Sequence, residues 1–197
     1  MLILASASPR RREILQQIGV LFEVYAADID ETPLEKESAK ALVKRLSKNK
    51  ALAVQQQYPN DCILASDTVV VGAQGHIYGK PESQEHAVDM LMSLSGTTHQ
   101  VVTGVVCCLR DELEVSYSQT WVTMRPFTQE EAIAYWHTKE PLGKAGGYAI
   151  QGFGAALINK IDGSYTGVVG LPVDVLVPML QKFNIAIWNI MEKGIES

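Results

Sequence analysis

The sequence lacks any continuous apolar stretch of the roughly 18–20 residues that a membrane-spanning helix needs. Its longest apolar run, Leu171 to Leu180, already contains Asp174 and Pro178. The short apolar N-terminus is followed at once by serines and arginines, whereas a secretory signal places its positive charge before a longer apolar segment. We therefore expect a cytoplasmic protein without a membrane partner.

Cysteine and histidine are also scarce, which argues against a disulfide framework and against a zinc site. The three cysteines are an odd number, and all of them fall in apolar runs that are typical of buried strands. The four histidines stand in separate parts of the chain and do not have the spacing of metal ligands.

Common signatures of nucleotide-binding proteins and hydrolases are absent as well. The chain has no Gly-x-x-x-x-Gly-Lys-[Ser/Thr] phosphate loop, no Gly-x-Gly-x-x-Gly after a strand, and no Gly-x-Ser-x-Gly elbow. A net charge of −5 and only 7% aromatic residues disfavour nucleic acid as a partner, because its binding relies on cationic and stacking side chains. A small polyanion in a local basic pocket is compatible with this composition.

What is present indicates a single α/β domain over residues 1–190, with 191–197 as a C-terminal tail. Apolar residues recur at helical spacing after Ser38, Ser83 and Thr128, each of which can cap a helix. Other helices are expected at 10–17 and from Pro172 onward. Because helices and hairpin signals intermix, we predict a mixed sheet flanked by helices. Its expected strands are 2–5, 22–25, 62–71, 101–109, 114–124 and 155–161.

A segment rich in serine and arginine, Ser6 to Arg12, stands where a strand is expected to pass into a helix. The backbone N–H groups and dipole of a helix start favour anions, and the forked guanidinium matches phosphate oxygens. Because cations in a first helical turn oppose the dipole, a purely structural role fits poorly. The segment predicts an anion site, with a solvated basic turn as the alternative.

Asp67 interrupts the apolar strand expected at 62–71. A buried carboxylate is costly unless it pairs with a cation, binds a metal or performs acid–base chemistry. A structural aspartate that caps a turn is the alternative interpretation. Lys80, held between a glycine and a proline, and Lys50, late in a long helix, are candidate phosphate contacts that could instead lie on the surface.

The segment from Lys144 to Gly154 is dense in glycine, which lets a backbone approach a ligand closely. Within it, Gln151 offers an amide donor and an acceptor suited to the edge of a base. A second glycine-rich loop, 163–170, leads into a helix expected to hold Pro172 in its first turn, and it could form another anion site or a lid. A turn-rich connection is the alternative for the first segment.

In their order along the chain, these segments resemble the motifs of the Maf family of nucleotide pyrophosphatases. The resemblance implies an elongated mixed sheet, two lobes around a cleft, and hydrolysis of a nucleoside triphosphate to its monophosphate and pyrophosphate. It also implies a divalent cation (Mg²⁺, Mn²⁺ or Co²⁺) and a homodimer. It runs from Ile3 to about Phe183 through Ser-Ala-Ser-Pro-Arg-Arg, Ser-Asp-Thr-Val-Val, Gly-Lys-Pro, Leu-Ser-Gly-Thr-Thr-His-Gln-Val-Val-Thr-Gly, Gly-Tyr-Ala-Ile-Gln-Gly and Val-Val-Gly-Leu-Pro.

The same resemblance implies roles for individual residues. Asp67 matches the family's catalytic proton acceptor, and together with Glu31 it is the expected metal ligand. The polar residues that match the phosphate end of the family's site are Ser6, Arg10, Glu31, Lys50 and Lys80.

Arg11, Thr68 and Gln151 match the subgroup of the family that acts on dTTP and UTP. The subgroup acting on 7-methyl-GTP tends to have Trp, Gln and Glu at or beside these places. We therefore expect hydrolysis of UTP and dTTP. The alternatives are a pyrophosphatase for 7-methyl-GTP or another modified nucleotide, and a non-catalytic nucleotide-binding regulator of cell division.

Overall fold

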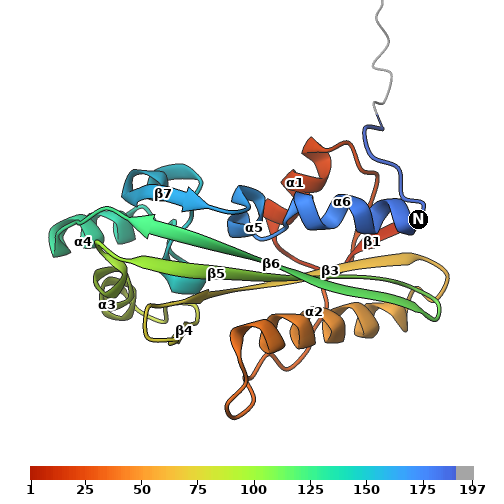
Figure 1. Ribbon diagram of the computed structural model, residues 1–197, viewed down its shortest axis with the longest axis horizontal. Helices are drawn as coiled ribbons and strands as arrows, with labels where there is room; N and C mark the ends of the chain where they lie inside the picture. Colours follow the sequence, from red (N-terminus) through yellow and green to blue (C-terminus); the bar gives the residue numbers. More distant parts are fainter. Residues whose placement is uncertain (190–197) are drawn as a thin grey trace, which may run out of the picture.

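The structure is a computed structural model that describes residues 1–189, in which a seven-stranded sheet is flanked by helices (Figure 1). The expected tail, 191–197, lies outside the described residues. The strands are β1 (Leu2–Leu4), β2 (Glu23–Val24), β3 (Cys62–Val71), β4 (Ile77–Tyr78), β5 (Thr98–Leu109), β6 (Glu112–Met124) and β7 (Ile158–Asp162). The helices are α1 (Pro9–Gln17), α2 (Ala39–Gln55), α3 (Gln84–Leu94), α4 (Gln129–His137), α5 (Tyr165–Val169) and α6 (Val173–Lys182), with 3₁₀ turns η1 (Ala145–Gly147) and η2 (Gly152–Leu157).

The sheet is mixed, as the sequence predicts. Its strand order is β2-β1-β3-β5-β6-β7, with β4 added beside β3. β1 is parallel to β2 and β3, and every other pairing is antiparallel. The long strands β3, β5 and β6 give the molecule its elongated shape (Figure 1). Among the described residues, no helix has both the length and the apolar character to cross a membrane.

Alternation along β3 creates a core on each face of the sheet. Cys62 and Leu64 pack with residues of α1 and α6, whereas Ile63 and Ala65 pack with residues of α2. A further core at the other end of the sheet joins β3 and β5 to α3 and α4. Figure 1 shows α3, α4 and β7 gathered at this end and α1, α2 and α6 at the opposite end, which gives two lobes.

The capping residues predicted from the sequence begin their helices. The hydroxyls of Ser38 and Ser83 each accept a hydrogen bond from a backbone N–H of the first turn. Thr128 and Glu131 form a complete capping box at the start of α4.

Three local predictions were wrong. The strand expected at 155–161 begins only at Ile158, because the preceding residues form η2. The loop expected at 163–170 contains the short helix α5, whose N-cap Ser164 accepts the Gly167 N–H. Pro172 is the N-cap of α6 and does not lie in its first turn.

Candidate functional site

The site forms where one edge of β3 has no neighbouring strand. On this edge β1 pairs with Cys62–Leu64 and β4 pairs with Val70 and Val71. Within the described part of the chain, residues 65–69 therefore have a strand partner only on the opposite edge, where β5 lies. Because β1 is parallel and β4 antiparallel to β3, the chain leaving β1 and the chain leaving β4 both run toward this gap.

A cavity of about 810 Å³ lies at the gap. Its volume falls within the range of roughly 300–1,000 Å³ that is usual for small-molecule sites. The charged residues that line it come from segments far apart in the sequence, and they are Arg10, Arg11, Glu31, Lys50, Asp67, Lys80 and Lys144. Ser6 and Thr68 also line it, so the fold brings together every site residue predicted from the sequence except Gln151.

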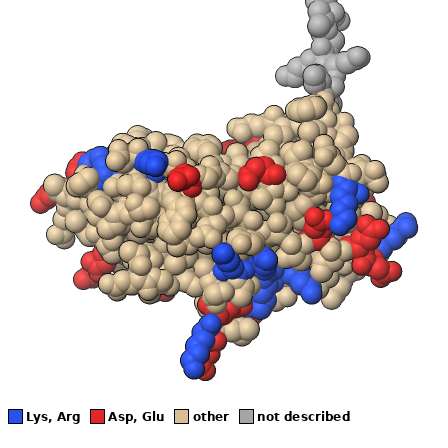
Figure 2. Space-filling view, viewed as in Figure 1, with Lys and Arg blue, Asp and Glu red and all other residues tan. Residues whose placement is uncertain are grey.

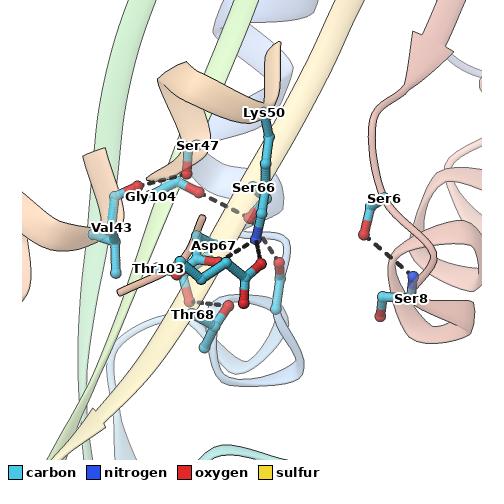
Figure 3. A network of polar contacts seen from close by, with 12 residues as sticks. Ser6, Ser8, Val43, Ser47, Lys50, Ser66, Asp67, Thr68, Thr103 and Gly104 are labelled. Atoms are coloured by element: carbon cyan, nitrogen blue, oxygen red, sulfur yellow. Dashed lines mark hydrogen bonds and ion pairs between the residues drawn. The ribbon is translucent and has the colours of Figure 1, made fainter. Parts of the chain in front are cut away.

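Asp67 is the buried acid that the sequence predicts, and β3 continues through it without a break. Lys50 reaches it from α2 and donates a hydrogen bond to Asp67 Oδ1 at 2.6 Å (Figure 3). The exposed fractions of the two side chains are 10% and 11%. Lys50 Nζ also lies 2.6 Å from Glu31 Oε1, so one ammonium group joins both carboxylates of the cavity.

Glu31 is more exposed than Asp67 and is surrounded by cations. Burial raises its pKa, but the hydrogen bond from Lys50 and the positive charges of Lys50, Lys80 and Arg11 together lower it below its ordinary value. Lys80 Nζ lies 4.0 Å from Glu31 Oε2. Glu31 is therefore ionised at neutral pH and partly balances the cations of the cavity.

Arg11 ties three segments together beside Asp67. Its Nε donates to Gly170 O at 2.9 Å, its Nη1 to Ser6 Oγ at 3.0 Å and its Nη2 to Thr68 Oγ1 at 3.3 Å. Burial lowers the pKa of Arg11, and the negative charge of Asp67 opposes this shift. The guanidinium thus holds the loop after β1, the strand β3 and the turn before α6 in one arrangement.

Arg10 and Lys144 line the cavity from opposite lobes. Burial lowers the pKa of Arg10, and burial together with the positive charge of Arg10 lowers the pKa of Lys144. Among residues 1–189, neither side chain forms a salt bridge with a carboxylate. Two neighbouring cations left without a carboxylate partner favour an anionic ligand.

Gln151 is half-buried and is not part of the cavity wall, although its neighbours Ala149 and Ile150 are. Tyr148, which also lines the cavity, is held by His99, whose Nε2 lies 2.7 Å from the tyrosine hydroxyl. Sequence analysis missed Tyr148 because its position depends on this buried, long-range contact.

The chain matches the family model described as Maf-like protein over residues 1–183. It belongs to the Maf family. A relative from Acinetobacter baylyi is 43% identical, with 91% of this chain and 97% of the relative covered. Relatives from Symbiobacterium thermophilum and Myxococcus xanthus are 45% and 48% identical, with 95% and 92% of this chain and 96% and 92% of the relatives covered. All three are named dTTP/UTP pyrophosphatase.

The residues of this Maf-family site would suit a divalent cation that binds together with a phosphate-bearing ligand. The described residues contain no group of three or more His, Cys, Asp or Glu side chains that could hold a metal alone. Glu31 and Asp67, however, meet at Lys50 and both border the cavity. Mg²⁺ is commonly bound in this way, by one or two carboxylates together with water and the phosphates of a substrate.

Sequence analysis also failed to name Lys144 as a cation of the cavity wall, although it lies in a segment singled out for its glycines. The useful signal was available, because Lys144 directly precedes Ala-Gly-Gly and therefore adjoins backbone that can approach a ligand. On the face in Figure 2, a group of Lys and Arg side chains lies near the middle, with Asp and Glu side chains scattered around it.

Proposed function

We propose that this Maf-family protein hydrolyses dTTP and UTP to the monophosphate and pyrophosphate. The observation that carries this proposal is the position of Asp67, a buried carboxylate at the wall of a cavity whose other charged groups are mainly cations. The names of the relatives support the same activity and the same pyrimidine substrates.

The triphosphate would bind to the cations gathered at the gap in β3. Arg10, Lys50 and Lys80 would contact phosphate oxygens, with the Ser6 hydroxyl beside them. Arg11 would act chiefly by positioning, because its donors are already directed to Gly170, Ser6 and Thr68.

Asp67 would accept a proton from the water molecule that attacks the α-phosphorus. As the new P–O bond forms, the bond from the α-phosphorus to the bridging oxygen breaks, and pyrophosphate leaves toward Arg10 and Lys80. Among the described residues, Lys50 alone donates a hydrogen bond to the Asp67 carboxylate, through Oδ1. The second oxygen is therefore left to accept a proton. A divalent cation held by Glu31 and Asp67 would supply further neutralisation of phosphate charge.

Thr68 and Gln151 are the proposed base contacts. The pyrimidine edge of uracil and thymine carries an N3–H donor between two carbonyl acceptors, and a glutamine amide can answer both kinds of group. Thr68 lines the cavity directly. Gln151 directly follows Ala149 and Ile150, which form part of the cavity wall.

The test is a pyrophosphate-release assay with UTP, dTTP, CTP, ATP, GTP and 7-methyl-GTP in the presence of Mg²⁺, Mn²⁺ or Co²⁺. We expect UTP and dTTP to react fastest. Hydrolysis in ¹⁸O-labelled water should place the label in the monophosphate, since water attacks the α-phosphorus. No hydrolysis of any nucleotide would refute the activity, and a flat substrate profile would refute the pyrimidine preference.

Asp67→Asn tests the role of the carboxylate. Loss of a positioned general base typically lowers the rate by roughly 10²–10⁴-fold. We expect such a loss of kcat in a variant that still folds, with a lower unfolding midpoint because Lys50 loses its buried partner. Turnover near that of the wild type would remove Asp67 from the mechanism.

A further inference from the structure

A hydrogen-bond network behind the cavity wall has no role in the proposed chemistry. Glu140, which follows α4, accepts the Phe153 N–H at Oε2 at 2.9 Å and the Gly154 N–H at Oε1 at 2.8 Å. Tyr135 of α4 donates its hydroxyl to Glu140 Oε1 at 2.7 Å. The same hydroxyl accepts the Ala149 N–H at 3.0 Å. One carboxylate and one phenol thus hold both ends of residues 149–154.

The backbone is shaped to let this network form. A Cβ atom at Gly152 would lie 2.1 Å from Glu140 Oε2, and one at Gly154 would lie 2.1 Å from Ala149 O. Both distances are far shorter than van der Waals contact, so any other residue would push the network apart. The glycines at these positions therefore have a specific structural cause that the sequence pattern alone does not reveal.

Further contacts fix the approach to this segment. The Lys144 ammonium donates to the backbone oxygen of Glu140, and the Gly146 N–H donates to Gly79 O at 3.0 Å. Tyr148 is held by its buried contact with His99. Ile150, which is buried and lines the cavity, and Gln151, which follows it, therefore lie between neighbours that are held on both sides.

We propose that Glu140 and Tyr135 are positioning residues that set base selectivity by holding Ile150 and Gln151 at a fixed distance from the nucleobase. The inference rests on the proposed function, since it concerns the base end of the same site. Hydrogen bonds to an ionised carboxylate are stronger than neutral ones, and three donors converge on this group. A segment held in this way keeps the spacing that distinguishes the N3–H of uracil from the N3 acceptor of cytosine, whereas a released segment adapts to either.

Tyr135→Phe and Glu140→Gln test this proposal. Tyr135→Phe removes the hydroxyl that joins Ala149 to Glu140 and leaves the net charge unchanged. Glu140→Gln keeps the shape of the side chain but turns an NH₂ group toward backbone donors. Kinetics with UTP and CTP give KM, kcat and the ratio of the two kcat/KM values. Inhibition by inorganic pyrophosphate reports on the phosphate end alone.

Two control variants lie on the same helix. Thr128→Ala removes the N-cap of α4 and weakens the helix without touching Glu140 or Tyr135. Glu130→Gln removes one exposed negative charge from α4. Both should keep the wild-type ratio of UTP to CTP hydrolysis, which separates positioning of the segment from general loss of stability or charge.

For Tyr135→Phe and Glu140→Gln we expect KM for UTP to rise about tenfold and the preference for UTP over CTP to fall about tenfold, because small misplacements of positioning groups have effects of this size. For Tyr135→Phe, pyrophosphate inhibition should stay within about twofold of the wild type, as expected when the phosphate end is untouched. An unchanged UTP-to-CTP ratio in folded variants, or an equal change in Thr128→Ala, would overturn the inference. A wild-type protein that hydrolyses no nucleotide would instead overturn the proposed function.

Discussion

Lys50→Met is the most direct probe of how the site is held together. The substitution keeps a long, flexible apolar stem in α2 and removes the ammonium group that contacts Asp67 and Glu31. It therefore leaves Asp67 as a carboxylate of low exposure without its partner. The expected consequence is a loss of stability well beyond what an exposed lysine would give.

The magnitude follows from the burial of the two ion pairs. Removing one member of a buried pair typically costs about 3–5 kcal/mol, because the remaining charge is left uncompensated. The Lys50–Glu31 pair adds only about 0–1 kcal/mol, since the Glu31 side chain is 47% exposed and solvent screens the interaction. Asp67 borders a cavity that water can enter, so the low end of the first range applies. We expect a total loss of about 3 kcal/mol.

Urea denaturation at neutral pH measures this loss. Lys48→Met is the matched control, because Lys48 is exposed on the same helix and should change the free energy of unfolding by less than about 0.5 kcal/mol. In the double variant Lys50→Met/Asp67→Asn the orphaned charge is gone, so about 2 kcal/mol should return. A loss below about 1 kcal/mol for Lys50→Met, or strictly additive effects in the double variant, would refute the idea that the pair is coupled.

Three other predictions follow from separate contacts. Burial lowers the pKa of His99 from 6.5 to about 4, so the unfolded chain binds a proton at higher pH than the folded protein does. The free energy of unfolding should therefore decrease by about 3 kcal/mol as the pH falls from 6.5 to 4. His99→Gln should flatten this part of the profile of urea midpoint against pH. Arg11→Lys keeps the positive charge but removes the forked guanidinium that contacts Gly170, Ser6 and Thr68. The KM for UTP should therefore rise about tenfold. Arg12→Lys, at an exposed position on the same helix, should leave KM unchanged. Gly154→Ala should lower the free energy of unfolding, measured with urea or heat, by about 1–3 kcal/mol because the added Cβ would overlap Ala149 O. Gly79→Ala is the control, because no atom lies within 4 Å of the added Cβ. This control should change the free energy of unfolding by less than about 0.5 kcal/mol.

The acid of the site was predictable because it breaks a local rule. A carboxylate inside a run of β-branched residues is a conflict that sequence alone displays, and Asp67 is buried in β3 as that conflict indicates. Of the lysines near the end of α2, the one that points inward is Lys50, but its pairing with Asp67 depends on how the helix crosses the strand. Helical spacing identifies a buried face and does not identify the residue opposite it.

The gap at the edge of β3 could not be predicted from the sequence, for a different reason. It exists because β1 and β4 pair with different parts of one edge of β3. The pairing of β1 with β3 joins residues about 60 positions apart in the sequence, whereas the pairing of β4 with β3 lies within a short hairpin. No local pattern in the sequence records which edge a short strand will take. The convergence of the loop after β1 and the chain after β4 is therefore a property of topology.

The helix α5 was missed because glycine at position 167 lowers local helix propensity. Tertiary contacts outweigh this cost: Ser164 caps the helix, and the Thr103 hydroxyl donates to Gly167 O at 2.8 Å. Thr103 also lies 3.0 Å from Thr68 Oγ1, so the same contact connects α5 to the proposed base end of the cavity. The glycine that lowers the helix propensity of α5 is thus the residue whose backbone oxygen accepts the hydrogen bond from Thr103.

The distribution of charge is compatible with the proposed binding of a triphosphate by an acidic protein. The cavity wall carries Arg10, Arg11, Lys50, Lys80 and Lys144 against the carboxylates Glu31 and Asp67, although the whole chain has a net charge of −5. Gathering cations in one place raises the free energy of the empty protein, and Asp67 and Glu31 reduce this cost by pairing with Lys50. A triphosphate that enters the cavity meets the excess positive charge at close range. The two carboxylates therefore offset part of the positive charge that the cavity gathers.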